Sequence, residues 1–278
     1  MIEVENLLYK YKNDKELAID SLSFDKGKIY GLLGCNGVGK TTLLSCISGL
    51  CRPRQGRILI DGNDVSIRRY DILKSLFFLP DKVGFSNIDF TIQTFLELNA
   101  PFYPCFNYDD FFSNLSLCNL SCDNKIATLT DGEQKKMMLS FAFATNTPYL
   151  LIDEPTKGLD MQSEGQFRKL VALNMNEERS LIIATNQVSG IENLLEHVVI
   201  LLKDGSVFNH SVETIANKIR FTTDDSCKSE ALYQQPITNG YIYLCPNYAD
   251  DLSALSLEAI FNAVNLNFKR INDFLNEG

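Results

Sequence analysis

Hydrophobic residues near the start of the chain alternate with polar residues in short segments, and polar turns separate these segments. The alternating pairs are Ile2 and Val4, Leu17 and Ile19, and Leu22 and Phe24. A period of two is typical of strands that bury one face and expose the other. We therefore expect a small antiparallel sheet within residues 2–33.

Later apolar segments are continuous, which is typical of strands buried on both faces. These segments span residues 28–33, 76–79, 149–152, 180–185 and 198–202. Other patterns predict helices over residues 42–50, 66–75 and 162–178, and a strand over residues 57–60 that ends in an Asp-Gly turn. Buried strands that alternate with helices predict an α/β fold. Its sheet is mostly parallel, with helices on both faces and the ligand at the carboxyl ends of the strands.

Residues 84–128 have a different character, because they are rich in aromatic residues and asparagine and their apolar spacing is helical. Pro101 and Pro104 mark breaks between helical segments. We interpret this region, together with the helix that follows residue 129, as an inserted helical subdomain at about residues 82–146.

The last part of the chain predicts a hairpin followed by a long helix. Residues 232–238 and 241–244 flank Asn239-Gly240, the sequence of a two-residue type I′ turn. Residues 256–275 then place apolar side chains on one helical face. The members of this stripe are Leu257, Ile260, Phe261, Val264, Phe268, Ile271 and Leu275. We expect the stripe to pack on the protein itself rather than to form an exposed docking face.

Composition narrows the class of protein. The 278 residues are 45% hydrophobic and carry a net charge of −9, with a pI near 4.8. Such a balance argues against nucleic acid or an anionic membrane surface as the main ligand. No apolar segment approaches the roughly 20 residues of a membrane-spanning helix, and the first residues lack a signal-peptide pattern. We expect a cytoplasmic chain that meets a membrane through a partner.

The eight cysteines show no paired metal-ligand spacing, so we interpret them as reduced thiols. Cys35 has two interpretations. It is an arbitrary residue of a loop, or a thiol made more acidic by neighbouring phosphate-binding amides.

The strongest chemical signal is a complete G-x-x-x-x-G-K-[ST] phosphate loop. It reads Gly34-Cys35-Asn36-Gly37-Val38-Gly39-Lys40-Thr41, with Thr42 next in the following helix. The loop lies between an apolar strand and a helix, as its chemistry requires. Its glycines let backbone N–H groups approach phosphate oxygens, and the start of the helix adds partial positive charge. We expect Lys40 to reach the β and γ phosphates and the Thr41 hydroxyl to bind Mg²⁺.

Two acids complete this predicted site. Asp153 ends an apolar strand, where it can hold the Mg²⁺ shell opposite Thr41, and Glu154 is placed to polarise an attacking water. Tyr11 follows the first alternating segment. It stacks on a base or simply ends the strand, and the sequence favours neither.

Together these motifs resemble the nucleotide-binding subunit of ABC transporters over about residues 1–210. Leu129-Thr130-Asp131-Gly132-Glu133 resembles a degenerate LSGGQ signature, residues 150–154 the Walker B strand, and residues 157–160 the D-loop. The tail, with Leu257-Glu258-Ala259-Ile260-Phe261, is similar to the ends of exporter-type subunits. The resemblance implies a P-loop NTPase core, an N-terminal antiparallel β subdomain and a small C-terminal α+β extension at residues 211–278.

The resemblance also implies partners and a reaction. Two subunits, identical or different, would sandwich two ATP molecules, so that Thr130 and Gly132 contact the γ-phosphate bound by the other subunit. Thr130 with Glu133 is a capping box, which directs a helix N-terminus outward. ATP hydrolysis would power a separately encoded permease, an exporter by this likeness. The permease would dock on residues 82–106, where the aromatic residues are Phe85, Phe90, Phe102 and Tyr103. The alternative is that these aromatics form the core of the helical subdomain itself.

Three departures from the family pattern bear on activity. Asp81 stands where glutamine is usual, although acidic residues there are familiar in exporter-type relatives, and we expect it to bind the metal or to act in catalysis. Asp131 and Glu133 add negative charge to the signature, and Asn186 replaces the switch histidine. Asn186 can donate a neutral hydrogen bond but carries no positive charge. We therefore expect slow ATP hydrolysis, with a regulatory ATP-binding subunit as the alternative. An ATPase that acts on ribosomes or DNA would need a tandem domain, a coiled coil or a basic patch. We find none of these in the sequence.

Overall fold

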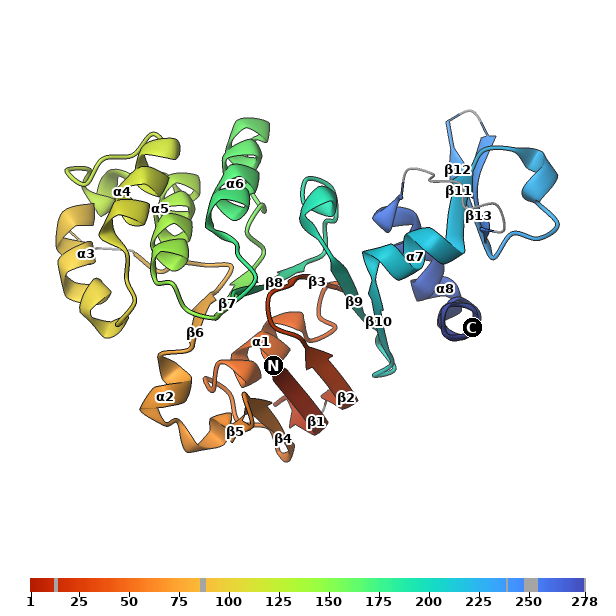
Figure 1. Cartoon of the computed structure of the whole chain (residues 1–278), viewed down its shortest axis with the longest axis horizontal. Helices are drawn as coiled ribbons and strands as arrows, with labels where there is room; N and C mark the ends of the chain where they lie inside the picture. Colours follow the sequence, from red (N-terminus) through yellow and green to blue (C-terminus); the bar gives the residue numbers. More distant parts are fainter. Residues whose placement is uncertain (13–14, 86–88, 239, 248–254, 278) are drawn as a thin grey trace.

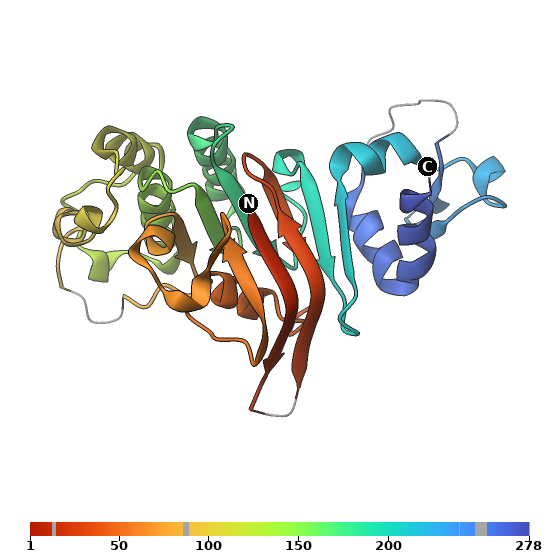
Figure 2. The same ribbon diagram turned by 60° about the horizontal axis from the view of Figure 1, so that its bottom comes forward.

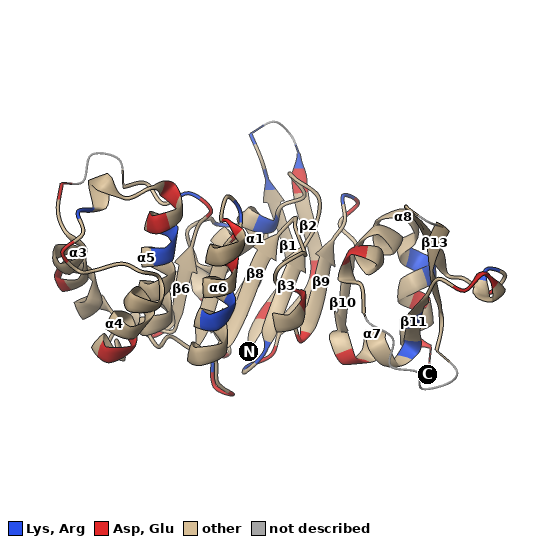
Figure 3. Cartoon of the chain, turned by 90° about the horizontal axis from the view of Figure 1, so that it is seen from above, with Lys and Arg blue, Asp and Glu red and all other residues tan. Residues whose placement is uncertain are grey.

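The computed structural model describes residues 1–12, 15–85, 89–238, 240–247 and 255–277. Figure 1 shows three groups of elements side by side: a helical group, a central group of sheets and a C-terminal group. The views in Figures 2 and 3 keep the same order. Among the described residues, none of the helices has the length and apolar character needed to cross a membrane.

The predicted antiparallel sheet is confirmed. It has the order β2-β1-β4-β5 and contains β1 (Ile2–Lys10), β2 (Glu16–Phe24), β4 (Gln55–Ile60) and β5 (Asn63–Asp64). The alternating pattern works as expected, because Ile2, Val4, Ile19 and Phe24 point into the core while their neighbours face outward. The turn after β4 uses Asp61 and Gly62, both at positive φ.

The predicted, mostly parallel sheet is also confirmed. It has the order β10-β9-β3-β8-β7-β6 and contains β3 (Ile29–Leu33), β6 (Leu76–Leu79), β7 (Tyr149–Asp153), β8 (Ser180–Thr185), β9 (His197–Leu201) and β10 (Val207–Ser211). Strands β9, β3, β8, β7 and β6 run parallel to one another. The edge strand β10 pairs antiparallel with β9. The sequence pattern missed β10, because this edge strand buries only Phe208 completely.

Two hydrophobic cores cover the two faces of this sheet, because successive strand residues point to opposite faces. Leu151 packs with the antiparallel sheet and with α1 (Lys40–Ile47). Its neighbours Leu150 and Ile152 pack with the helical group and with α6 (Met161–Asn174). The sheet thus lies between helices and the antiparallel sheet.

The single helix predicted over residues 66–75 is wrong. The structure has a 3-10 turn, η1 (Val65–Ile67), and a four-residue helix, α2 (Tyr70–Leu73). Between them Arg68 adopts a left-handed conformation, with φ of 50°, which ends the first turn.

The helical group holds the predicted insertion, packed around a shared aromatic core. Its elements are α3 (Ile92–Asn99), η2 (Ala100–Phe102), α4 (Tyr108–Leu117), η3 (Ile126–Thr128) and α5 (Asp131–Ala144). Phe141 on α5 contacts the rings of Phe95, Tyr103, Phe106 and Phe111. These contacts join helices that the prolines separate in sequence.

The C-terminal group follows β10. Its elements are α7 (Val212–Lys218), β11 (Ile219–Thr222), η5 (Asp225–Cys227), β12 (Tyr233–Ile237), β13 (Gly240–Pro246) and α8 (Leu257–Asn276). The short turn η4 (Glu192–Leu194) comes earlier, between β8 and β9. The strands predicted as a hairpin, β12 and β13, pair with each other, and β11 extends their sheet. Residue 239, the first of the predicted turn, lies outside the described residues.

The predicted apolar stripe of α8 is packed on the protein. Leu257, Ile260, Val264, Ile271 and Leu275 are all buried within the same core that covers one face of the central sheet. His210 on β10 also contacts Asn272 on α8, with 3.0 Å between its Nε2 atom and Oδ1.

Candidate active site

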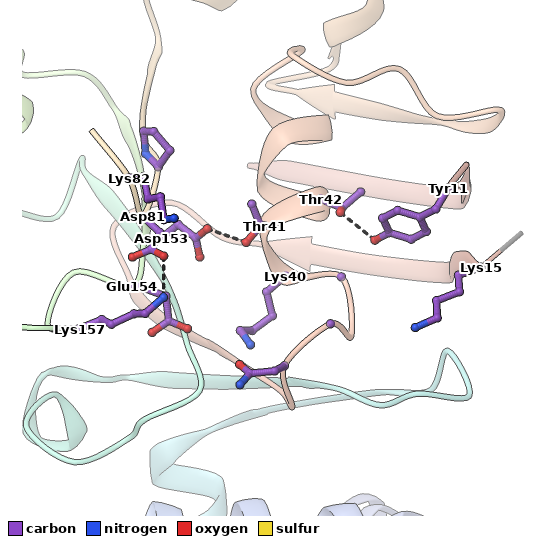
Figure 4. Close-up of a pocket in the computed structure, with 14 residues that line it drawn as sticks. Tyr11, Lys15, Lys40, Thr41, Thr42, Asp81, Lys82, Asp153, Glu154 and Lys157 are labelled. Carbon is purple, nitrogen blue, oxygen red and sulfur yellow. Dashed lines mark hydrogen bonds and ion pairs between the residues drawn. The ribbon is translucent and has the colours of Figure 1, made fainter. Parts of the chain in front are cut away.

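A hollow of about 560 Å³ opens at the carboxyl ends of β3 and β7. Figure 4 shows that side chains from opposite sides point into it. The lining residues are Tyr11, Lys15, Asn36, Gly37, Gly39, Lys40, Thr41, Thr42, Pro80, Asp81, Lys82, Asp153, Glu154 and Lys157. Five of the eight predicted loop residues and the three predicted acids, Asp81, Asp153 and Glu154, therefore lie at one place.

The phosphate loop wraps around the first turn of α1, as its glycines require. Gly37 and Gly39 have φ of 76° and 117°, values that side chains disfavour, and a Cβ atom at Gly39 would lie 2.9 Å from Leu17. Gly39 caps α1 without any side-chain hydrogen bond. The first N–H groups of α1 are therefore available to an anion.

Lys40 is held at the centre of this loop. Its ammonium donates hydrogen bonds to the carbonyl oxygens of Gly34 at 2.7 Å and Cys35 at 3.5 Å. Only 7% of the residue is exposed, and burial lowers its pKa while the carboxylates of Glu154 and Asp153 oppose that shift. A buried cation next to a nest of N–H groups is suited to phosphate oxygens.

Thr41 and Asp153 face each other across the hollow. The Thr41 hydroxyl donates a hydrogen bond of 2.6 Å to Oδ2 of Asp153. The other oxygen, Oδ1, is buried and has no hydrogen-bond partner among the described residues. Burial raises the pKa of Asp153, so the ionised carboxylate is disfavoured without a cation. A hydroxyl and an unpaired carboxylate oxygen are the hard ligands that Mg²⁺ prefers, so these residues fit that ion.

Glu154 is fixed in a strained backbone conformation. Its φ is 50°, a left-handed value that costs energy for a residue with a side chain. Its carboxylate accepts hydrogen bonds from the Thr185 hydroxyl at 2.9 Å and from the backbone N–H of Asn186 at 3.1 Å. Adjacent strands thus position one carboxylate at the edge of the hollow.

Asn186 contacts both halves of the site. Its backbone binds Glu154, and its side-chain amide donates a hydrogen bond of 2.8 Å to Oδ1 of Asn36 in the phosphate loop. The residue at the switch position therefore bridges the acid and the loop.

Asp81 lines the hollow but pairs with lysines rather than with the predicted metal ligands. Its carboxylate lies 2.7 Å from Nζ of Lys157 and 3.7 Å from Nζ of Lys135. Its metal and catalytic roles therefore stay predictions.

Sequence reasoning missed the lysines of this region. Lys135 on α5 is buried, and its ammonium donates hydrogen bonds to the carbonyl oxygens of Glu154 at 2.8 Å and Lys157 at 3.1 Å. Burial lowers its pKa. Lys135 thus joins the helix after the signature segment to the backbone beside the acid. A lysine among apolar residues of a helix is a weak signal without the fold.

Tyr11 lies at the mouth of the hollow, directly after β1. Its hydroxyl donates a hydrogen bond of 2.7 Å to Thr42, and its ring packs edge-on against Tyr9. The predicted base stacking remains open, since the contact with Thr42 also suits a residue that ends the strand.

Thr130 and Gly132 lie away from this hollow, at the start of α5. The predicted capping box is present, because Thr130 Oγ1 accepts from the Glu133 N–H at 3.3 Å and the Glu133 carboxylate accepts from the Thr130 N–H at 2.9 Å. The Thr130 N–H and the Thr130 hydroxyl, the latter at 2.8 Å, both donate to the Glu133 carboxylate, which lowers the pKa of Glu133 and holds its charge against Thr130. Asp131 and Gly132 line a second hollow of about 660 Å³.

This chain is similar to known proteins in sequence and in fold. A family model described as ABC transporter matches residues 17–157. The chain is 31% identical over 235 residues to the methionine import ATP-binding protein MetN of Carboxydothermus hydrogenoformans, which covers 77% of this chain and 67% of that protein. It is 27% identical over 209 residues to the lipopolysaccharide export system ATP-binding protein LptB of Haemophilus influenzae, covering 72% and 86%.

Solved structures share the fold. The dimeric structure of an ATP-binding cassette in a post-hydrolysis state, bound to ADP and Pi, matches with a TM-score of 0.63 and 22% identity. The match covers 76% of this chain and 99% of that one.

Proposed function

This chain belongs to the ABC transporter family of ATPases, and we propose that it is the subunit whose ATP hydrolysis powers a separately encoded membrane permease. The predicted P-loop NTPase fold is that of the family's ATP-binding domains. The observation that carries the proposal is the hollow where Lys40, the Thr41–Asp153 pair and Glu154 converge.

Each of these residues has a separate task in the proposed reaction. Lys40 and the N–H groups at the start of α1 bind and neutralise the ATP phosphates. Thr41 and Asp153 would hold Mg²⁺, which supplies charge neutralisation at the phosphate oxygens when bound. Glu154 accepts the proton of the attacking water, and Thr185 with the Asn186 N–H keeps its carboxylate in place.

The proposed active unit has two ATP-binding subunits, either two copies of this chain or this chain with a second subunit. Thr130 and Gly132 do not line the hollow of their own chain. Thr130 is exposed and Gly132 is half-buried at the start of α5, a position that suits a contact with ATP held by the other subunit.

The permease would dock on the helical group. Of the aromatics predicted for this surface, Phe102 is 72% exposed, and nearby Leu98 is 58% exposed. Phe85, Phe90 and Tyr103 instead pack partly against the core, and residues 86–88 lie outside the described residues. A photo-crosslinker at Phe102 should label the permease in the purified complex, and one at Tyr241 of the C-terminal group should not. The reverse labelling pattern would refute this surface.

Location and direction complete the proposal. The chain would lie in the cytoplasm, at the inner face of the membrane, held there by its permease. We predict export from the C-terminal tail and from Asp81. The two relatives do not decide the direction, because MetN is named for import and LptB for export. ATP-driven uptake of substrate into inside-out vesicles that hold the complex tests export, and release from preloaded vesicles would contradict it.

One observation favours a second candidate, a regulatory ATP-binding subunit with little hydrolysis. Asn186 supplies a neutral amide where the family uses histidine, and both oxygens of the Glu154 carboxylate already accept hydrogen bonds. Turnover by the complex with its permease distinguishes the two candidates.

Binding of Mg-ATP tests the site itself. Replacing Lys40 by alanine removes charge-assisted hydrogen bonds and should weaken ATP binding roughly 10- to 100-fold. Calorimetric titration measures this, with exposed Lys203→Ala as the matched control. Equal affinity of Lys40→Ala and wild type would refute the nucleotide site.

A further inference from the structure

A second basic site lies apart from the nucleotide hollow. A hollow of about 490 Å³ opens between the end of α1, β4 and η1, and it shares no lining residue with the nucleotide hollow. Arg52, Arg54, Arg57 and Arg68 line it, with Asp64 as its one acidic lining residue. Five of the nine arginines of the chain lie within residues 52–69, so the expectation that the sequence holds no basic patch is wrong. We call this the arginine hollow.

The local charge is opposite to that of the whole chain. Residues 49–75 contain six basic and three acidic residues, whereas the chain carries a net charge of −9. Figure 3 shows acidic residues on helices elsewhere, as on α4. An anionic surface would therefore repel much of the molecule and attract this face, which also fixes how the molecule approaches.

Of the four arginines that line the hollow, only Arg57 forms an ion pair among the described residues. Glu5 pairs with Arg57, and Asp71 lies 3.3 Å from Arg69 and 3.2 Å from Lys74. Asp64 accepts the Ser66 N–H at 2.7 Å. Among the described residues, no acid lies within ion-pair distance of Arg52, Arg54 or Arg68. Three unpaired guanidinium groups around one hollow suit bidentate contacts with phosphate.

Exposed apolar side chains lie among the same arginines. Leu50, in the lining, is 63% exposed, Ile67 is 65% exposed and Tyr70 is 63% exposed. Single exposed apolar residues are ordinary, but three interleaved with arginines resemble segments that lie in a membrane interface. Two of the three are aliphatic, which suits acyl chains better than the stacked bases of a nucleic acid.

We propose that the arginine hollow binds the phosphate headgroups of anionic phospholipids, with Leu50, Ile67 and Tyr70 entering the headgroup boundary. The proposal extends the proposed function, which places the chain beside a membrane. It does not depend on any step at the nucleotide hollow. Lipid contact of this kind would orient the chain on the membrane before or while it binds the permease.

Flotation of the full-length chain with lipid vesicles tests the proposal. Vesicles of phosphatidylcholine mixed with phosphatidylglycerol should bind the chain, more weakly as salt rises, and phosphatidylcholine alone should not. Replacing Arg52, Arg54 and Arg68 by glutamine should lower binding roughly fivefold per arginine, about 100-fold for the triple variant. The same loss of charge at exposed Lys169, Lys203 and Lys228 should leave binding unchanged.

Several outcomes would overturn the proposal. Equal binding by the arginine variant and the lysine control would show that the hollow is not the contact. Displacement by inorganic phosphate, but not by chloride at equal ionic strength, would indicate a site for free phosphate instead. Arginine-dependent binding of single-stranded RNA in place of vesicles would indicate a nucleic-acid surface. Calorimetric ATP binding by the arginine variant, expected at wild-type affinity, shows separately whether the nucleotide site is intact.

Discussion

The side-chain amide of Asn186 donates a hydrogen bond to Oδ1 of Asn36 across 2.8 Å, so the residue after β8 lies directly against the phosphate loop. The backbone N–H of the same residue binds Glu154 at 3.1 Å. Asn186 is therefore placed to sense both the phosphate loop and the acid, although it brings no positive charge to either.

Replacing Asn186 by histidine should speed turnover. A charge-assisted hydrogen bond stabilises the transition state more than a neutral one, so kcat should rise roughly 10- to 100-fold while KM hardly changes. Steady-state kinetics on the purified chain measure both constants. An unchanged kcat in the histidine variant, beside a briskly active wild type, would contradict this role. Inactivity of both proteins, even with the permease present, would favour the regulatory candidate.

Replacing Asp153 by asparagine should stabilise the protein without nucleotide while it abolishes tight Mg-ATP binding. The substitution removes a buried charge whose Oδ1 has no partner, which should raise the free energy of unfolding by about 1 kcal/mol at neutral pH. Denaturant unfolding measures this change. A destabilised variant would show that Asp153 is satisfied in some other way.

The pH dependence of that gain has a fixed sign. Burial raises the folded-state pKa of Asp153 above its ordinary value of 3.8. Between these two pKa values the folded chain binds more protons than the unfolded chain, so the stability of the wild type falls as pH rises. The advantage of the asparagine variant should therefore grow as pH rises through this window and level off above it. An advantage that shrinks with rising pH would contradict the assignment.

Lys135 should be needed for stability. Lys135→Met leaves the carbonyl oxygens of Glu154 and Lys157 without this donor, which should lower the free energy of unfolding by about 1 to 3 kcal/mol. Lys169→Met, at an exposed position of α6, is the control and should change it by less than about 0.5 kcal/mol. Equal effects of the two substitutions in thermal or denaturant unfolding would argue against the role of Lys135.

The sequence predicted those parts of the fold that depend on local pattern. Continuous apolar segments located the five parallel strands, because a strand buried on both faces has few other solutions. β10 was missed, since its polar residues face outward at a sheet edge and only Phe208 is fully buried. The helix over residues 66–75 was wrong, because no pattern signals the left-handed conformation of Arg68.

The residues of the candidate site also fall into two groups, those that the local sequence predicts and those that only the tertiary structure brings together. The phosphate loop was predictable because its chemistry fixes the spacing of its residues, and Asp153 and Glu154 were predictable because they follow a continuous apolar strand. Lys135 was not, because its partners are carbonyl oxygens brought together from distant segments. The pairing of Asp81 with Lys157, 76 positions further along, likewise depends on tertiary structure.

The role of Glu154 is tested most directly by measuring steady-state ATP turnover of the wild-type chain and of its Glu154→Gln variant. Calorimetric ATP binding is measured on the same preparations. If Glu154 accepts the proton of the attacking water, the glutamine variant should bind ATP at least as tightly as wild type. Its kcat should be lower by about 10² to 10⁴. A glutamine variant with wild-type turnover would contradict this account and transfer the role to another group, with Asp81 the first to examine.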